Sequence, residues 1–315
     1  MHNIIRIVDN IYGRYEITEP VILKIINSPE LQRLKRVSQF GGLPDNYPFP
    51  IFYRFEHSLG VMILLDRMKA SLEEKIAGLI HDIAHTVFSH VIDFVMGSTE
   101  NEDYQDHTHE EFFKKSSIAM ILTKYGFDIE KIAGQKNFLL LEQPIPKLCA
   151  DRIDYALREL KSWANPGIVP EILADLTVID DKIVFKTKET ANKFAVNFLR
   201  LQTEHWGGAG ASSRYYQLAE IIKKALAAKI LTLKDLYGDD SLLSKKIEQS
   251  PLQADFEKLK SKTLSKVGVT IIKKFRYVDP DIIDNNRVIP LSESESGFLR
   301  ELERHRRQNA LGIEI

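Results

Sequence analysis

Residues 75–96 read KIAGLIHDIAHTVFSHVIDFVM, and the fold expected for the chain depends mainly on this stretch. Immediately before this stretch, Ser71 and Glu74 form the S-x-x-E pattern of a capping box, which marks the beginning of a helix. Apolar residues then fall on nearly every side of that helix: Ile76, Ala77, Leu79, Ile80, Ile83, Ala84 and Val87. A helix that is apolar all round is buried. The stretch therefore predicts a central, buried helix.

Helical patterns also dominate the rest of the chain. They cover residues 28–40, 55–68, 145–160 and about 190–236, the last interrupted by a glycine-rich loop at 206–213. Two β-branched runs in LTVIDDKIVF flank Asp180 and Asp181 and predict a hairpin. Further extended segments follow at 267–278 and 285–292, and a short charged helix at 298–308 comes last. The expected fold class is mostly α, with a small α+β region at the C-terminal end.

The composition is that of an ordinary globular protein. Of 315 residues, 44% are hydrophobic and 28% are charged, which excludes a disordered tail or a fibrous repeat. Lys and Arg number 43 against 44 Asp and Glu, so the net charge of −1 gives no overall basic field for a nucleic acid. The single cysteine, Cys149, excludes an intrachain disulfide framework. With no signal-peptide pattern and no apolar run of about 20 residues, we expect a soluble, cytoplasmic protein without membrane contact.

Histidines concentrate in one part of the chain. Six of the nine lie between residues 57 and 109, and the pair His81–Asp82 falls in the middle of the expected buried helix. His85 follows His81 by four residues, so a continuous helix would place both on one face. Burying Asp82 among apolar side chains is costly unless a partner neutralises it. The partner can be another core side chain, but the accumulation of histidines favours a divalent metal ion.

The types of side chain narrow the choice of metal. Imidazole and carboxylate groups suit Mn²⁺, Fe²⁺, Co²⁺, Ni²⁺ or Zn²⁺, whereas Ca²⁺ prefers oxygen ligands only. His57 lies on the helix before the His81–Asp82 stretch, and a short connection would pack the two helices against each other. Asp151, three residues before Asp154 on one helical face, is the candidate for a further ligand.

Several motifs, in order along the chain, resemble the HD-domain metal-dependent phosphohydrolases. They are LQRLKRVSQFGG at 31–42, RFEHSLGV at 54–61, LIHDIAHTVFSH at 79–90, HEEFF at 109–113 and DRIDYALRE at 151–159. Within that superfamily they are most similar to the deoxynucleoside-triphosphate triphosphohydrolases. The resemblance covers about residues 30–160, with weaker similarity to about residue 220. It implies an HD-domain helical core that holds one divalent metal ion, with Mg²⁺ added to the candidates above.

The resemblance implies roles for individual residues. The metal ligands would be His57, His81, Asp82 and Asp151. The catalytic residues would be His109, Glu110 and His85, with His107 as an alternative to His109. The substrate contacts would be Arg54, His85, His90, Arg152 and Tyr155 for the phosphates, Tyr216 and Gln217 for the deoxyribose, and Gln39 without a more specific role. Relatives in this branch carry an arginine two turns before the Tyr-Gln pair. This chain has Gly207 and Gly208 there, so lysines such as Lys223 and Lys224 would have to compensate.

Three functions therefore stay open. The first is hydrolysis of a deoxynucleoside triphosphate to deoxynucleoside and triphosphate. The second is a nucleoside monophosphatase or phosphodiesterase of the same superfamily. The third is a nucleotide- or single-stranded nucleic-acid-binding module with an inactive site, in which aromatic residues such as Trp206, Tyr215 and Tyr216 would stack on bases. A nucleotide is the expected partner, and nucleic acid is not favoured because all the implied metal ligands are present.

The resemblance also suggests how the chain is divided. We expect an HD-domain core with the metal site at 1–165, a hairpin and helices that complete the substrate pocket at 166–265, and a C-terminal segment at 266–315. Members of this branch assemble as oligomers. The C-terminal segment, with its basic cluster Arg304 to Arg307, is the candidate interface of a homo-oligomer.

Overall fold

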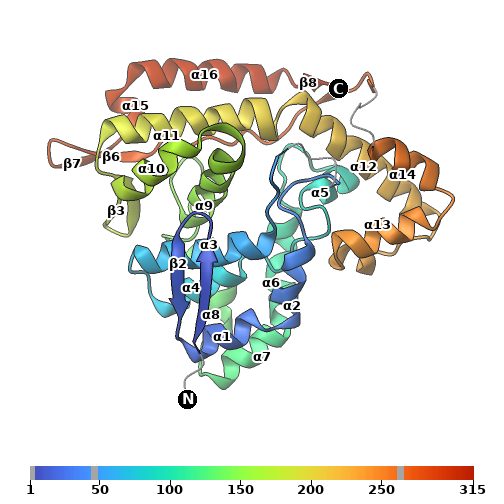
Figure 1. Cartoon of the computed structure of the whole chain (residues 1–315). Coiled ribbons are helices and arrows are strands. Elements are labelled where there is room, and N and C mark those ends of the chain that lie inside the picture. Colours follow the sequence, from blue (N-terminus) through green and yellow to red (C-terminus); the bar gives the residue numbers. More distant parts are fainter. Residues whose placement is uncertain (1–3, 44–48, 261–265) are drawn as a thin grey trace.

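Helices α3 and α4 lie at the centre of the N-terminal half of the chain (Figure 1). The computed structural model describes residues 4–43, 49–260 and 266–315. In chain order the elements of this half are β1 (Ile5–Asp9), β2 (Gly13–Ile17), α1 (Pro20–Ile26), α2 (Pro29–Arg33), η1 (Leu34–Arg36), α3 (Arg54–Arg67), α4 (Leu72–Ile80), α5 (Val91–Met96), α6 (Tyr104–Lys114), α7 (Ser117–Lys124), α8 (Ile129–Ala133), η3 (Gln135–Asn137) and α9 (Ala150–Glu159). The N-terminal strands β1 and β2 form an antiparallel hairpin that the sequence patterns did not predict.

The prediction of one continuous helix over residues 75–96 is wrong. The stretch is buried as expected, but α4 ends at Ile80, residues 81–90 form turns, and α5 begins only at Val91. Contacts from distant residues hold these turns. The Arg33 guanidinium donates to the carbonyls of Ile83 and His85 at 2.8 and 2.7 Å. These bonds satisfy carbonyl groups that a continuing helix would otherwise have paired, so the helix can end without leaving them unsatisfied.

The C-terminal half adds a small sheet flanked by helices. Its elements are η4 (Leu160–Ala164), η5 (Pro166–Ile168), α10 (Val169–Asp175), β3 (Leu176–Ile179), β4 (Lys182–Phe185), α11 (Lys188–Arg200), η6 (Leu201–Trp206), α12 (Ala209–Ala227), η7 (Leu233–Tyr237), α13 (Asp240–Glu248), α14 (Gln253–Lys260), β5 (Thr270–Ile271), β6 (Asp281–Asp284), β7 (Arg287–Pro290), α15 (Leu291–Ser294), α16 (Ser296–Ala310) and β8 (Ile313–Glu314). The sheet order is β3-β4-β6-β7, and the predicted hairpin around Asp180 and Asp181 is confirmed as β3 and β4. Figure 1 shows α16 lying along α11.

The predicted glycine-rich loop at 206–213 is mostly helix. After the wide π-helical turn η6, Gly208 caps α12, which already includes residues 209–213. The expected extended segment at 267–278 contains only one short strand, β5, which pairs with β8. Among the described residues, no helix is both long and apolar enough to cross a bilayer.

One hydrophobic core joins the two halves. It runs from Tyr12 to Leu302 and includes residues of α3, α4, α9, α11, β6 and α16. A second core lies around α5, α12, α13 and α14. The first core crosses the boundaries expected at residues 165 and 265, because strand β4 pairs with β6 and both pack against α11.

Candidate metal centre and substrate pocket

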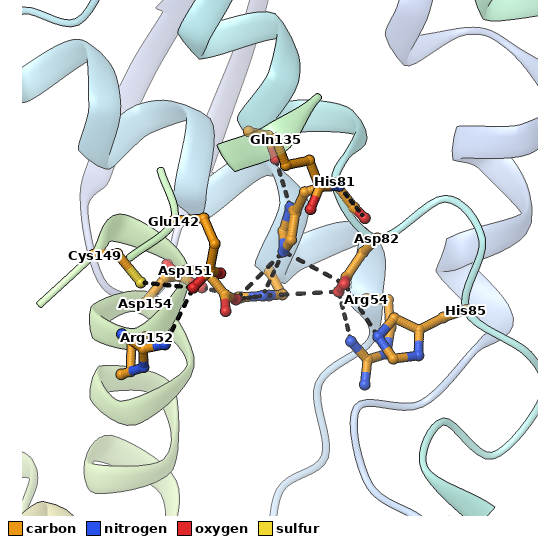
Figure 2. Close-up of polar contacts among 12 residues, drawn as sticks. Arg54, His81, Asp82, His85, Gln135, Glu142, Cys149, Asp151, Arg152 and Asp154 are labelled. Carbon is orange, nitrogen blue, oxygen red and sulfur yellow. Dashed lines mark hydrogen bonds and ion pairs between the residues drawn. The ribbon is translucent and has the colours of Figure 1, made fainter. Parts of the chain in front are cut away.

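Three helices bring the predicted metal ligands together. His57 lies in the first turn of α3, His81 directly follows α4, and Asp151 lies in the first turn of α9. The His57 Nε2 atom is 2.9 Å from Asp151 Oδ1 and 3.1 Å from His81 Nε2. His81 Nε2 is 3.3 Å from the same Asp151 oxygen, and Figure 2 shows these two side chains pointing toward each other.

A glycine allows α3 and α9 to approach this closely. Gly60 lies one turn after His57, and a Cβ atom at this position would come within 2.1 Å of Asp154 Oδ1 and of the Arg158 guanidinium. Contacts this short do not occur between real side-chain atoms. The absence of a side chain at residue 60 therefore lets Asp154 reach His57, with 2.7 Å between Asp154 Oδ2 and His57 Nδ1.

Hydrogen bonds on the far side of each ring fix both imidazoles for metal binding. His57 Nδ1 contacts the Asp154 carboxylate, and His81 Nδ1 lies 2.7 Å from the carbonyl of Gly78. Both partners accept hydrogen bonds, so each ring keeps a proton on Nδ1. When the Nε2 atoms give up their protons on binding a metal, their lone pairs would face the same space beside Asp151. This is the arrangement of ligating histidines held by a second set of contacts, so the residues fit a metal ion.

The electrostatics of the cluster also suit a cation. Burial opposes charge on His81, yet the carboxylates of Asp82 and Asp151 raise its pKa to about 9. Burial likewise opposes charge on Asp151, but its bonds to His57 and His81 hold the pKa of this carboxyl well below its usual range. The same carboxylates that favour a proton on the imidazoles would favour a divalent ion between them.

Asp82 borders the same space and connects it to two further predicted residues. Its Oδ1 and Oδ2 atoms lie 3.4 Å from His81 Nε2 and 3.7 Å from His57 Nε2, respectively. Oδ2 also accepts a hydrogen bond from Arg54 Nη1 at 2.6 Å, and Oδ1 lies 3.2 Å from His85 Nε2. Arg54 Nη2 is buried without a hydrogen-bond partner among the described residues, so this donor stays available to a ligand. All four predicted ligands thus belong to one cluster.

Helix α6 brings a catalytic candidate to this cluster. Its Gln105 side chain donates to the carbonyl of His81 at 3.2 Å and to Asp82 Oδ1 at 3.1 Å. His109 lies one turn later on the same helical face and is buried, with neither ring nitrogen hydrogen-bonded within the described part of the chain. His107 points away, with a side chain that is 75% exposed. The structure thus distinguishes the two histidines that the HTHE sequence left as alternatives.

The expected partner of His109 lies elsewhere in this structure. Glu110 is exposed, and its carboxylate pairs with Lys114 at 2.7 Å. Burial, together with the positive charge of His81, lowers the pKa of His109 to about 4. At neutral pH the imidazole is therefore uncharged and can accept a proton.

A pocket lies next to the metal cluster, and several predicted substrate contacts line it. Gln39, His90 and Tyr155 are among its lining residues. The Tyr155 ring is 6.3 Å from the His57 ring, and the His90 ring is 5.4 Å from that of His85, measured between ring centroids. The pocket and the metal cluster therefore adjoin each other.

Other predicted contacts do not line the pocket. The Arg152 guanidinium donates to the carbonyls of Lys147 and Gln143 and pairs with Glu142 at 3.1 Å, so it holds the loop before α9. Tyr216 does not line the pocket and packs against the second core, and the Gln217 amide donates to Ser213 Oγ at 2.8 Å.

Tyr215, the neighbour of Tyr216 along α12, lines the pocket instead. Its hydroxyl accepts a hydrogen bond from the Gly41 amide at 2.9 Å, which fixes the ring. Gly41 has no side chain, and a Cβ atom there would lie 2.2 Å from the Tyr215 ring. Of these two neighbouring tyrosines, Tyr215 is the one that lines the pocket, whereas the resemblance implied Tyr216 as the substrate contact.

The lysines expected to compensate for Gly207 and Gly208 do not reach this pocket. Lys223 pairs with Glu220, and Lys224 pairs with Asp255, both on exposed parts of α12. Trp206 and Tyr215 line the pocket and Tyr216 packs into the core, so these aromatic and basic residues do not form the single stacking surface that the nucleic-acid alternative requires.

Several residues of the pocket were not predicted from the sequence. They are Phe40, Glu102, Glu159, Lys273 and Arg276, whereas Trp206 and Tyr215 were named only as stacking residues of the nucleic-acid alternative. Lys273 and Arg276 come from KKFRYV in the C-terminal segment, which was noted only as extended. The only sequence signal for these residues was the presence of basic side chains in an otherwise apolar stretch. Their position beside His90 depends on tertiary packing.

Comparison with known proteins agrees with the site. Residues 54–158 match the HD domain family. The uncharacterized protein YdhJ of Bacillus subtilis is 31% identical, over 90% of both chains. The metal-dependent phosphohydrolase cns2 of Cordyceps militaris is 39% identical over 52% of this chain and 47% of its own length.

A more specific similarity covers a smaller part of the chain. The deoxynucleoside triphosphate triphosphohydrolase SAMHD1 of Gallus gallus is 30% identical over 39% of this chain and 24% of its own length. Among solved structures, a phosphohydrolase from Bacteroides thetaiotaomicron shares the fold, with a TM-score of 0.66, 17% identity and coverage of 94% and 95% of the two chains.

Proposed function

Because this chain belongs to the HD-domain metal-dependent phosphohydrolases, we propose that its substrate is a deoxynucleoside triphosphate, which it hydrolyses to deoxynucleoside and triphosphate. The observation that carries the proposal is the convergence of His57, His81 and Asp151 beside a pocket lined by cationic and aromatic side chains. The partial similarity to SAMHD1 supports the choice of a deoxynucleotide.

The proposed metal site consists of His57, His81, Asp82 and Asp151. A divalent ion bound there would supply Lewis acidity toward a phosphate oxygen and toward an attacking water molecule. Arg54 has a free donor beside Asp82, so it can neutralise charge on the phosphate. His85 lies 3.2 Å from the same Asp82 carboxylate, but burial and the nearby Arg54 lower its pKa well below the ordinary value, so the neutralising charge would come from Arg54. His109, uncharged and buried one turn from Gln105, would act as the base that takes a proton from the attacking water.

The pocket beside this site would hold the rest of the nucleotide. Tyr215 and Trp206 offer aromatic faces for the sugar or base, whereas Lys273 and Arg276 offer positive charge. The fixed Tyr215 ring takes the sugar-packing role that the family resemblance assigned to Tyr216. An aromatic ring against the sugar leaves a 2′-hydroxyl without a partner, which favours deoxyribose.

The proposal is tested by metal content and by the identity of the product. We expect the purified protein to contain a divalent transition metal and to release inorganic triphosphate from deoxynucleoside triphosphates, measured by ion chromatography over a panel of deoxy- and ribonucleotides. The variants His57→Ala and Asp82→Ala should lose metal and activity together. Lys223→Ala, on an exposed part of α12, is the control. Metal-free Asp82→Ala protein with full activity would refute the metal-dependent chemistry.

The same assay tests the second candidate function. Gly207 and Gly208 occupy the place of the arginine found in the resembled branch, and this favours a substrate with fewer phosphates. Release of orthophosphate from monophosphates, without triphosphate from any deoxynucleoside triphosphate, would replace the proposed substrate by a nucleoside monophosphate and leave the metal-dependent hydrolysis unchanged.

A further inference from the structure

Two cations from the C-terminal segment lie in the pocket and share one carboxylate. The Arg276 guanidinium pairs with Glu102 Oε2, and Lys273 Nζ lies 3.4 Å from Glu102 Oε1. Glu102 comes from the turn just before α6, and its side chain is only 1% exposed. The Lys274 amide also donates to the carbonyl of Thr99, so the two segments are joined by backbone as well as by charge.

The two cations and the two carboxyl groups in this part of the pocket together carry a net charge of about +1 at neutral pH. Glu102 keeps its negative charge, because Arg276 and Lys273 lower its pKa to about 2 despite burial. It can neutralise only one of the two cations. Burial raises the pKa of Glu159, the other carboxyl in the pocket, to about 8, so at neutral pH it is mostly uncharged. A buried charge without a counterion is costly, and a bound anion would remove that cost.

The Arg276 side chain has the geometry to bind such an anion. Among the described residues Glu102 is its only ion-pair partner, and the side chain keeps 17% of its surface exposed where it lines the pocket. A guanidinium carries five donors in a planar fork that matches the oxygens of a phosphate. Lys273 is held more tightly, since Nζ also donates to the carbonyl of Trp206 at 2.9 Å and lies 4.3 Å from the centre of the Tyr215 ring.

The pocket that holds this cation pair shares two of its lining residues with the surroundings of the metal cluster. His90 and Tyr155 line the same pocket as Arg276, and they contact His85 and His57 respectively. A phosphate chain that reached from the metal cluster past His90 and Tyr155 would enter the pocket that Arg276 lines.

We propose that Arg276, assisted by Lys273, forms an anion-binding subsite for the phosphate chain of the substrate, and that Glu102 limits its strength by competing for the guanidinium. This inference deepens the proposed function and rests on a phosphorylated substrate. It makes the C-terminal segment a determinant of specificity, because a substrate with a single phosphate at the metal cluster would leave this subsite unused.

The test is the binding of inorganic tripolyphosphate to the full-length protein by isothermal titration calorimetry, with the metal content measured before and after. We expect Arg276→Ala to weaken binding by about 10- to 100-fold, the range for the loss of a charge-assisted contact. Glu102→Gln should bind several-fold more tightly, because it frees the guanidinium. Arg306→Ala is the control, since that arginine lies on α16, pairs with Glu303 and does not line the pocket.

The two variants should change tripolyphosphate affinity in opposite directions, and this distinguishes a binding role of Arg276 from a structural one. If the Glu102–Arg276 pair only held α6 in place, Glu102→Gln and Arg276→Ala would weaken binding alike, and the subsite would be refuted. Unchanged binding in Arg276→Ala would refute it as well. If Arg276→Ala does not fold, as judged by thermal melting, Arg276→Lys provides the comparison, with weaker binding expected because the planar fork is lost.

The outcome is independent of the substrate assay. Tripolyphosphate binding that depends on Arg276, in a protein that hydrolyses no nucleotide, would sustain the subsite and overturn the proposed function. Nucleotide hydrolysis with the same KM in wild type and Arg276→Ala would sustain the proposed function and refute the subsite.

Discussion

His109 combines deep burial with ring nitrogens that hydrogen-bond to no described residue, and buried polar atoms without a partner often mark a functional site. It lies on the face of α6 that approaches the metal cluster through Gln105. We expect His109→Ala to keep its metal but to slow turnover by roughly 10²–10⁴-fold, the usual effect of a lost acid or base. Metal analysis and steady-state kinetics on the same sample check this.

His107 provides the matched control for that experiment. It lies on the same helix two residues earlier, and it is largely exposed. His107→Ala should retain both metal and turnover. If instead His107→Ala slows the reaction and His109→Ala does not, the catalytic histidine has been assigned to the wrong residue.

Glu159 gives a prediction for pH dependence. It is buried and lies 3.0 Å from His205 Nε2, and burial raises its pKa to about 8, compared with about 4.5 in the unfolded chain. Between these values the folded state binds more protons than the unfolded state, so this group lowers the free energy of unfolding as pH rises from about 4.5 to 8.

We therefore expect Glu159→Gln to flatten that pH dependence. The amide keeps a hydrogen-bond donor for His205 and cannot ionise. At pH 8 the variant should be more stable than wild type by about 1–3 kcal/mol, and at pH 5 it should show no such gain. Urea denaturation at both pH values measures this difference. A variant that loses stability equally at both pH values would show that the carboxyl is needed for its shape and not for its proton.

At the scale of elements, the turn segment 81–90 depends on Arg33. Its guanidinium donates to the carbonyls of Ile83, His85 and Gly238 at 2.8, 2.7 and 2.9 Å, respectively. Without these donors the three carbonyls lose their partners and His81 and Asp82 lose their support. We expect Arg33→Ala to lower the free energy of unfolding by about 2–4 kcal/mol and to weaken metal binding. Chemical denaturation and metal titration measure the two effects.

Arg36 provides the control for this element. It lies one turn further along, pairs with Asp239, and its side chain is 62% exposed. Arg36→Ala should cost no more than about 1 kcal/mol, as exposed ion pairs usually do. Equal losses for the two variants would mean that the chain ends α4 at Ile80 without help from Arg33.

At the scale of the whole molecule, the core shared by both halves predicts a single unfolding transition. Phe298 on α16 is 2% exposed and belongs to the same core as Val61, one turn beyond His57. Phe298→Ala should lower the free energy of unfolding by about 3–5 kcal/mol. Leu299, its neighbour on α16, is 41% exposed and should tolerate alanine at a cost below about 1 kcal/mol.

The cooperativity can be measured directly. Loss of helical circular dichroism and release of the metal should coincide during denaturation of Phe298→Ala and of the wild type. Unfolding of the C-terminal half while the metal stays bound would show that the two halves are independent domains, despite their common core.

Much of the metal cluster was predictable from the sequence, because local patterns report burial. A histidine and an aspartate within an apolar run must be buried, and a buried carboxylate needs a partner. This reasoning pointed to His57, His81 and Asp82, with Asp151 as a candidate further ligand, and the family resemblance implied all four as the ligand set. The structure brings His57, His81 and Asp151 together, and Asp82 borders them. The hairpin at β3 and β4 was also predictable, because its alternation and its turn residues are adjacent in the chain.

Only the tertiary structure decided where the buried stretch stops being helical and what completes the pocket. A periodic pattern shows which side of a helix is buried, but it contains no information about a donor such as Arg33, about 50 residues away, that allows the helix to end. The pairing of Glu102 with Arg276 joins residues from distant parts of the chain, and the choice of Tyr215 over Tyr216 depends on the approach of Gly41. These contacts arise from packing between elements, and a local sequence pattern does not specify them.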